Sequence, residues 1–101
     1  MAYYLQLLVL TDEGRLKFEA DPDWIKELNA NMELMGVKIK TQYALLGQWD
    51  FVNIIEAPSD EVAATAGIRL SASRMVHPMT LAAIPLENLA AALKKGTRPP
   101  W

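Results

Sequence analysis

The feature that most constrains the fold is an apolar N-terminal segment, Ala2 to Leu10, in which Gln6 alone is strongly polar. A strand with one face in water alternates apolar and polar residues, whereas a strand covered on both faces does not. The segment lacks the basic start and the cleavage site of a secretory signal, and it is far shorter than the ~20 residues that cross a bilayer. It therefore predicts a central strand of a cytoplasmic protein with no membrane partner.

A helix is expected after Asp21-Pro22, because aspartate is a favoured N-cap and proline fits the first helical position. Apolar residues then recur at helical spacing on one side, and Gly36 supplies the C-terminal stop. These apolar residues are Trp24, Ile25, Leu28, Met32 and Met35. From Thr11 to Ala20 we expect only a short helical turn or a loop.

Two further strands are predicted to form a hairpin around Gly47-Gln48. From Val37 to Leu45, apolar residues, Thr and Tyr alternate with polar ones, which predicts a strand with one buried side. Lys38 and Lys40 would point the other way, and lysine commonly protects the edge of a sheet. Phe51 to Ala57 is nearly apolar and is expected to be a central strand.

A second helix and a last strand follow. Ser59 is a suitable N-cap for a helix that is expected to run to about Arg74. The segment from Met75 to Ile84 is typical of a strand, and Pro78 places it at an edge because proline cannot donate to a ladder. Pro85 then opens a short C-terminal helix that ends near Gly96.

The length and the charge limit the classes of function. A chain of 101 residues has the size of one domain, which we assign to residues 1–96 with a short tail at 97–101. Ten basic and twelve acidic residues are too balanced for a phosphate-binding surface, so no nucleic acid partner is expected. The absence of cysteine excludes disulfides and thiolate metal sites, and neither a metal nor a cofactor is expected.

The order strand, helix, strand, strand, helix, strand predicts a ferredoxin-like α+β sandwich with an antiparallel four-stranded sheet. Both helices would cover one face, and the other face would be an apolar area on the order of 400 Å². Such a face favours a homo-oligomer in which a two-fold axis stacks two sheets into a barrel. The residues predicted on this helix-free face are Tyr4, Gln6, Leu8, Leu10, Phe51, Asn53 and Ile55.

The stretch Gly47-Gln48-Trp49-Asp50, followed by the apolar residues 51–58, resembles the motif that names the GYD domain family, with Trp49 in place of the usual tyrosine. The likeness spans about residues 3 to 84 and includes Thr11-Asp12-Glu13-Gly14 and Thr80-Leu81. The resemblance implies a dimeric α/β-barrel protein of bacterial type with a ferredoxin-like fold. The family has no settled biochemical activity.

Several polar and aromatic side chains are candidate ligand contacts. Buried Gln6, Gln42 and Asn53 would each cost about 1–3 kcal/mol without partners, so they either bond to each other or face a ligand. The candidate ligand-binding residues are Gln6, Trp49, Asp50, Asn53 and His77. Gly47 and Asp50 also suit the chemistry of a turn, and tryptophan at position 49 also suits packing.

Two functions follow from these residues. The first is a ligand-binding or interaction domain that holds a small molecule in a cleft near the hairpin and the barrel interior. The alternative is a cofactor-independent, monooxygenase-like or isomerase-like enzyme acting on a small aromatic or carbonyl compound, with His77 as base and Trp49 and Asn53 orienting the substrate. The chain carries no phosphate-binding glycine loop and no nucleophile elbow, which favours the first.

Overall fold

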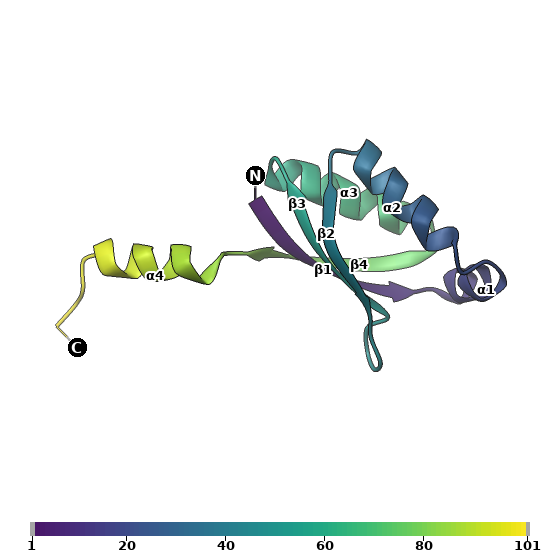
Figure 1. Ribbon diagram of the computed structural model, residues 1–101, viewed down its shortest axis with the longest axis horizontal. Helices are drawn as coiled ribbons and strands as arrows, with labels where there is room; N and C mark the ends of the chain where they lie inside the picture. Colours follow the sequence, from purple (N-terminus) through teal and green to yellow (C-terminus); the bar gives the residue numbers. More distant parts are fainter. Residues whose placement is uncertain (1, 101) are drawn as a thin grey trace.

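The computed structural model describes residues 2–100 and shows one antiparallel sheet with helices before, between and after its strands (Figure 1). The sheet order is β2-β3-β1-β4, which confirms the predicted ferredoxin-like α+β arrangement with β1 and β3 in the middle. The elements are β1 (Ala2–Leu10), α1 (Asp12–Ala20), α2 (Trp24–Leu34), β2 (Lys38–Ala44), β3 (Phe51–Ala57), α3 (Asp60–Ala72), β4 (Val76–Ala83) and α4 (Leu86–Lys95).

A helix occupies the segment from Thr11 to Ala20, so the expectation of a short turn or loop there is wrong. The Thr11 hydroxyl caps α1 by accepting a hydrogen bond from the Gly14 N–H at 3.0 Å, and two acidic residues lie in the first turn. The Thr11 N–H also donates to the Met75 carbonyl at 2.9 Å. A Cβ at Gly14 would lie 2.1 Å from that same oxygen, so only glycine permits this contact between α1 and the start of β4.

The predicted N-cap of the next helix is also wrong. The Asp21 N–H donates to the Lys17 carbonyl at 2.9 Å and ends α1, and α2 begins at Trp24 with Asp23 as its N-cap. The reason is that α1 extends up to Asp21, which makes this aspartate the end of one helix instead of the start of another.

The boundaries of α3 follow the prediction more closely. The Ser59 hydroxyl accepts a hydrogen bond from the Val62 N–H at 3.2 Å and is the expected N-cap. The helix ends at Ala72, and Arg74 has a φ of 67°, a left-handed conformation that turns the chain into β4.

The edge strand β2 does not keep one buried side along its length. A β-bulge between Ile39 and Thr41 shifts the register against β3. Ile39 therefore lies on the helix-covered side, whereas Thr41 and Tyr43 lie on the other side. Tyr43 is 63% exposed, and Gln42 is turned inward beside Asn53. The alternation in the sequence cannot reveal the extra residue of the bulge.

The helices cover the opposite face of the sheet from the one predicted. Strand alternation divides the side chains into two sets, but it does not say which set the helices cover. Here α2 and α3 supply hydrogen-bond partners to the set that contains the polar residues, and this set forms the core. The residues of this set, all at most 6% exposed, are Tyr4, Gln6, Leu8, Leu10, Phe51, Asn53 and Ile55. Leu8→Lys would therefore place an unpaired charge in the core of the single chain.

Tyr4 joins the sheet to the start of α3. Its hydroxyl donates a hydrogen bond to Asp60 Oδ1, and this bond, together with burial, raises the pKa of Tyr4 from 10.0 to about 12. The unfolded chain releases the proton at a lower pH than the folded chain does. The stabilisation is therefore complete below pH 10.0 and is lost as the pH rises toward about 12.

We expect the urea midpoint of the wild-type protein to fall between pH 10.0 and about 12 more steeply than that of Tyr4→Phe. The comparison removes the contribution of every other titrating group, because only the hydroxyl differs between the two proteins. Equal slopes in the two proteins would contradict the assignment.

No helix within residues 2–100 combines the length and the hydropathy that a bilayer crossing requires.

Candidate interaction surface

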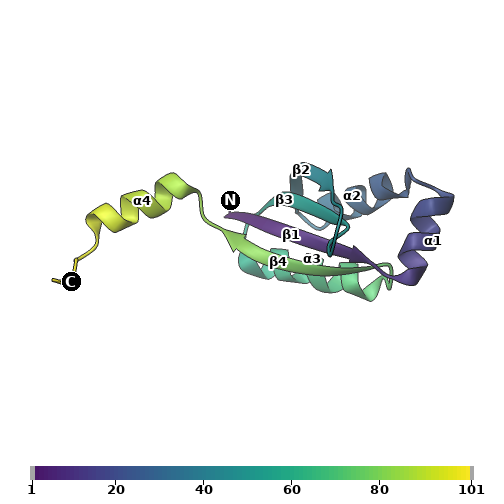
Figure 2. The ribbon, with the colours of Figure 1, turned by 90° about the horizontal axis from the view of Figure 1, so that it is seen from below.

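α2 and α3 lie on one side of the sheet and leave the other face open (Figure 2). The residues on this open face are predominantly apolar. Paired residues of antiparallel strands lie on the same face, so the register identifies its members. We call this surface the open sheet face. Its members are Tyr3, Leu5, Leu7, Val9, Thr41, Tyr43, Val52, Ile54, His77, Met79, Leu81 and Ala83.

Several of these side chains are well exposed in the single chain, among them Tyr3 at 39%, Met79 at 46% and Leu81 at 44%. One corner of the face is polar, where Glu56 lies 3.6 Å from the Lys40 ammonium. Toward α4 the face contains a hollow of about 300 Å³. Its lining residues are Tyr3, Ile54, Ala83, Ile84, Pro85 and Glu87. A contiguous apolar surface of this kind is typical of protein–protein contacts.

On the other, helix-covered face, the candidate residues Gln6 and Asn53 belong to a series of hydrogen-bonded amide side chains that runs from β1 across β3 and β2 to α2. We call this series the amide chain. Asn53 Nδ2 donates to Gln6 Oε1 at 3.0 Å, and Gln42 Nε2 donates to Asn53 Oδ1 at 2.8 Å. Gln42 and Asn29 of α2 then form two reciprocal bonds of 3.0 Å each. The interpretation that the polar strand residues bond to each other is therefore confirmed, although they do so under the helices.

One donor of the amide chain is left over. Gln6 is fully buried, and its Nε2 has no acceptor within residues 2–100. Gln6 lies between two paired residues, Asn53 of β3 on one side and Thr80 of β4 on the other. An unpaired buried amide donor costs about 1–3 kcal/mol, so this position suits a small polar partner.

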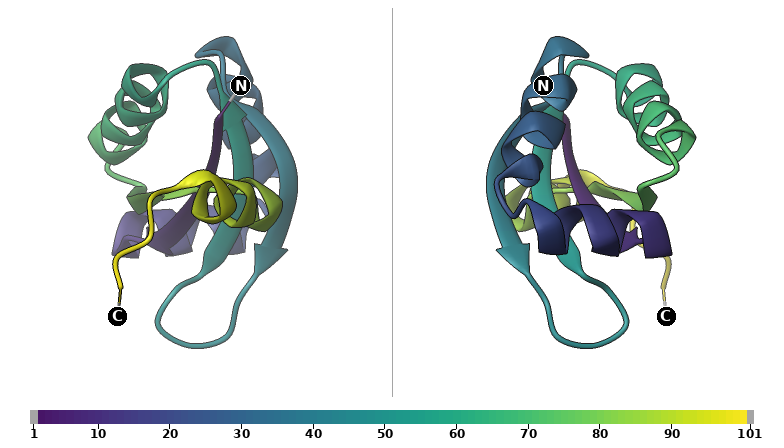
Figure 3. Two further views of the ribbon diagram at one scale, coloured as in Figure 1. Left: turned by 90° about the vertical axis from the view of Figure 1, so that its left-hand side faces the viewer. Right: turned by 90° about the vertical axis from the view of Figure 1, so that its right-hand side faces the viewer.

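Asp50 ties the β2–β3 hairpin to the end of β1. Its Oδ2 accepts a hydrogen bond from the Leu10 N–H at 2.7 Å, and its own N–H donates to the Leu8 carbonyl at 2.9 Å. The Arg15 guanidinium lies 3.8 Å from the same carboxylate oxygen. Asp50 is thus structural, and it holds in place a hairpin whose tip extends away from the body (Figure 3).

Replacing Asp50 by Ala is expected to lower the free energy of unfolding by about 1–2 kcal/mol, because the buried Leu10 N–H loses a charged acceptor. Urea unfolding monitored by far-UV circular dichroism measures the change. Asp50→Asn keeps an acceptor oxygen and should lose less. Unchanged stability in Asp50→Ala would contradict this role.

The remaining candidates do not meet at one place. Trp49 is half-buried in the hairpin loop, where Gly47 adopts a φ of +120°. His77 pairs with Val9 on the open sheet face, whereas Asn53 lies on the buried face. The base and the orienting amide of the alternative enzyme are therefore on opposite sides of the sheet. Within residues 2–100, no group of His, Asp and Glu side chains is arranged to hold a metal ion.

Other hollows lie between elements. One of about 350 Å³ lies between α3 and β4, bordered by His77, Thr80 and Gly67. Another, of about 340 Å³, lies between α2 and α3 with Leu28 and Leu70 in its lining and Arg69 beside them. Neither brings together the residues singled out in the sequence.

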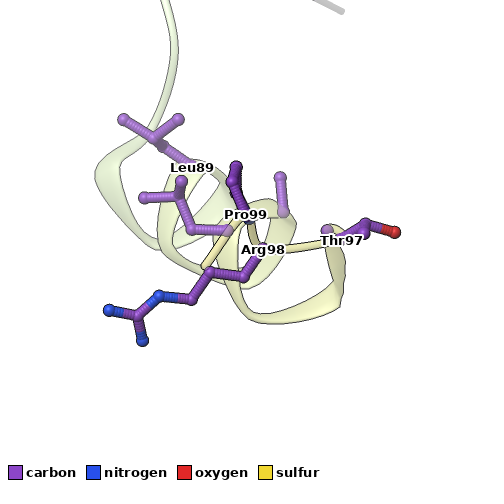
Figure 4. A pocket seen from close by; sticks show the side chains of 7 residues that line it. Leu89, Thr97, Arg98 and Pro99 are labelled. Carbon is purple, nitrogen blue, oxygen red and sulfur yellow. The ribbon is translucent and has the colours of Figure 1, made fainter. Parts of the chain in front are cut away.

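A further hollow, of about 470 Å³, lies between α4 and the chain that follows it. Leu89, Thr97 and Pro99 border it, and the Arg98 guanidinium extends away from it (Figure 4). All of its lining residues come from this end of the chain, so it is a feature of α4 and not of the sheet.

The apolar members of the open sheet face were missed as functional residues in the sequence because they had been assigned to the helix side. The sequence did contain a difference between the two sides of β1. Leu5, Leu7 and Val9 form a purely apolar set, whereas the alternate set contains Gln6.

Residues 4–93 match the family model described as the GYD domain. The chain is also similar to a protein of Thermus thermophilus named "Glutamine synthetase and cystathionine beta-lyase binding protein". The two are 41% identical over 95 residues, which cover 93% of this chain and 100% of the relative. The match to the family model includes the hairpin and most of α4.

Proposed function

Because this chain belongs to the GYD domain family and leaves one sheet face apolar and open, we propose that it is a homo-oligomeric protein-interaction domain. The open sheet face carries the proposal. A two-fold axis would let the same face of two copies cover one another, with the sheets stacked ~10 Å apart. The exposed aromatic and aliphatic side chains of both copies would then lie in a common core.

We propose that the oligomer binds a second protein, an enzyme of the kinds named for the relative. The T. thermophilus protein is named for binding glutamine synthetase and cystathionine beta-lyase, and its similarity to this chain covers its whole length. The hairpin tip offers a separate contact surface, because Leu46 is fully exposed there and Leu45 is 38% exposed. Asp50 holds the base of the hairpin, so little ordering would be needed on binding.

Binding of the purified chain to purified glutamine synthetase and cystathionine beta-lyase from the same organism, measured by surface plasmon resonance, tests this proposal. At least one enzyme is expected to bind, and Leu46→Asp should weaken binding by about tenfold or more. Leu34→Asp, at another highly exposed leucine on α2, is the matched control and should bind like the wild type. Failure of both enzymes to bind would contradict the proposed partners.

A second candidate function, small-molecule binding, is favoured by one observation, the buried Gln6 Nε2 without an acceptor. Native mass spectrometry of the gently purified protein is expected to show a small-molecule adduct that Gln6→Leu abolishes. A wild-type mass without any adduct would remove this candidate and leave water as the partner of Gln6.

A further inference from the structure

The C-terminal helix α4 stands apart from the rest of the molecule. It projects along the long axis, beyond the ends of the strands (Figures 1 and 2), and the described residues extend 58 Å in that direction. None of its ten residues is buried, and within residues 2–100 it makes no extensive contact with another helix or strand. Isolated helices shorter than ~12–15 residues are marginal in water, so α4 needs a surface to pack on.

The side of α4 that would pack is apolar. Leu86, Leu89 and Leu93 are spaced by three and four residues, which places them on one side of the helix. All three are exposed, as is Ile84 just before the helix. Ile84 and Pro85 also line the hollow at the α4 end of the open sheet face, so the two apolar surfaces are continuous.

The two ends of the molecule carry opposite charge. From Asp12 to Glu27, around α1, there are six acidic and three basic residues, whereas from Leu86 onward there are three basic residues and one acidic. Glu13, Glu19 and Asp21 form no ion pair within residues 2–100, and neither do Lys94 and Lys95. Leu16, at 74% exposed, gives the α1 end an apolar contact of its own.

Sheets stack with their strands within ~30° of each other, and a two-fold axis between them can run along the strands or perpendicular to them. The perpendicular axis sets the long axes of the two copies side by side in opposite directions, and it is the one that brings the basic end of one copy to the acidic end of the other. α4 and α1 lie at opposite ends of the long axis (Figure 2). The α4 of each copy would therefore reach the α1 end of the other.

We propose that α4 is an exchanged arm that docks on a second copy of this chain. Its leucine stripe packs on the α1 end of that copy, and its lysines face the acidic residues there. This inference rests on the proposed homo-oligomer. It adds a contact that the open sheet face does not contain.

Cross-linking tests the arm directly, because the chain has no cysteine and only introduced ones can react. Full-length Leu93→Cys and Leu16→Cys proteins, each with a different tag, are mixed and treated with a short bis-maleimide. We expect a linked species that carries both tags. Ile68→Cys, at 71% exposed on α3, replaces Leu16→Cys as the matched control and should give little linked product with Leu93→Cys.

The outcomes separate this inference from the proposed function. If Leu7→Glu on the open sheet face separates the copies but Leu93→Cys links no better to Leu16→Cys than to Ile68→Cys, the arm is overturned and the sheet contact stands. If the specific link forms while Leu7→Glu keeps the wild-type mass, the arm stands and the sheet contact fails. A wild-type protein that stays a single chain would overturn both.

A second measurement concerns the leucine stripe itself. Leu89→Glu is expected to raise the dissociation constant of the oligomer by about tenfold or more, measured by sedimentation equilibrium. Ala91→Glu adds the same charge on the opposite side of α4 and should leave the constant within about twofold. Equal effects of the two variants would overturn the assignment of the packed side.

Discussion

Leu7→Glu is expected to convert the proposed homo-oligomer into a folded single chain of 11.3 kDa. Leu7 lies in the middle of the open sheet face, where it pairs with Val52 on one side and Met79 on the other. The single chain leaves it partly exposed and so tolerates the carboxylate. A stacked pair of sheets would bury the charge without a partner, at a cost of about 3–5 kcal/mol, which is a loss of roughly a hundredfold to several thousandfold in affinity.

Light scattering coupled to size exclusion, at micromolar concentration, measures the mass, and circular dichroism checks that the fold is kept. Ile68→Glu introduces the same charge at an exposed apolar position of α3 and should keep the wild-type mass. A Leu7→Glu protein with the wild-type mass would show that the open sheet face is not the contact between copies.

Asn53→Ala is expected to cost about 3–5 kcal/mol of the free energy of unfolding, a large share of the 5–15 kcal/mol typical of a domain. Asn53 is the middle of the amide chain, so its removal leaves both Gln6 Oε1 and Gln42 Nε2 short of a bond. The burial of Asn53 and Gln6 means that water cannot replace these bonds without a rearrangement. Urea unfolding measures the loss.

Asn29→Ala is the control, because Asn29 of α2 is the last member of the amide chain and is only half-buried. Its loss should cost about 1 kcal/mol, since solvent can reach the freed Gln42 amide. Equal costs at the two positions would mean that the amide chain does not behave as a buried unit.

The order of elements and the sheet edges were predictable from local signals. Ser59 as a cap, the lysines of β2 and the proline in β4 each act within a few residues, and these features were confirmed. The helix α1 was missed because it has only two large apolar side chains, Leu16 and Phe18, and so shows no helical apolar period. Its N-cap threonine and acidic first turn were the available signal.

The choice of the covered face depends on tertiary partners that no strand pattern contains. Asn29 and Asp60 lie on helices, and they make the set with Gln6 and Asn53 suitable for burial. For the same reason the predicted ligand contacts do not converge, because the polarity of Gln6 and Asn53 serves the amide chain and that of Asp50 serves the hairpin. Sequence polarity identified these residues but not their partners.

The amide chain has a consequence for how the strands find their alignment. Residues on one side of a strand repeat every second position, so a slip of two residues between β1 and β3 would still bury an apolar set. In the native pairing Gln6 lies opposite Asn53, and Asn53 lies opposite Gln42. After such a slip Asn53 would lie opposite Tyr4 or Leu8. Each side-chain amide left without a hydrogen-bond partner would then cost about 1–3 kcal/mol. Three amides therefore select one alignment among apolar strands that would otherwise be nearly interchangeable.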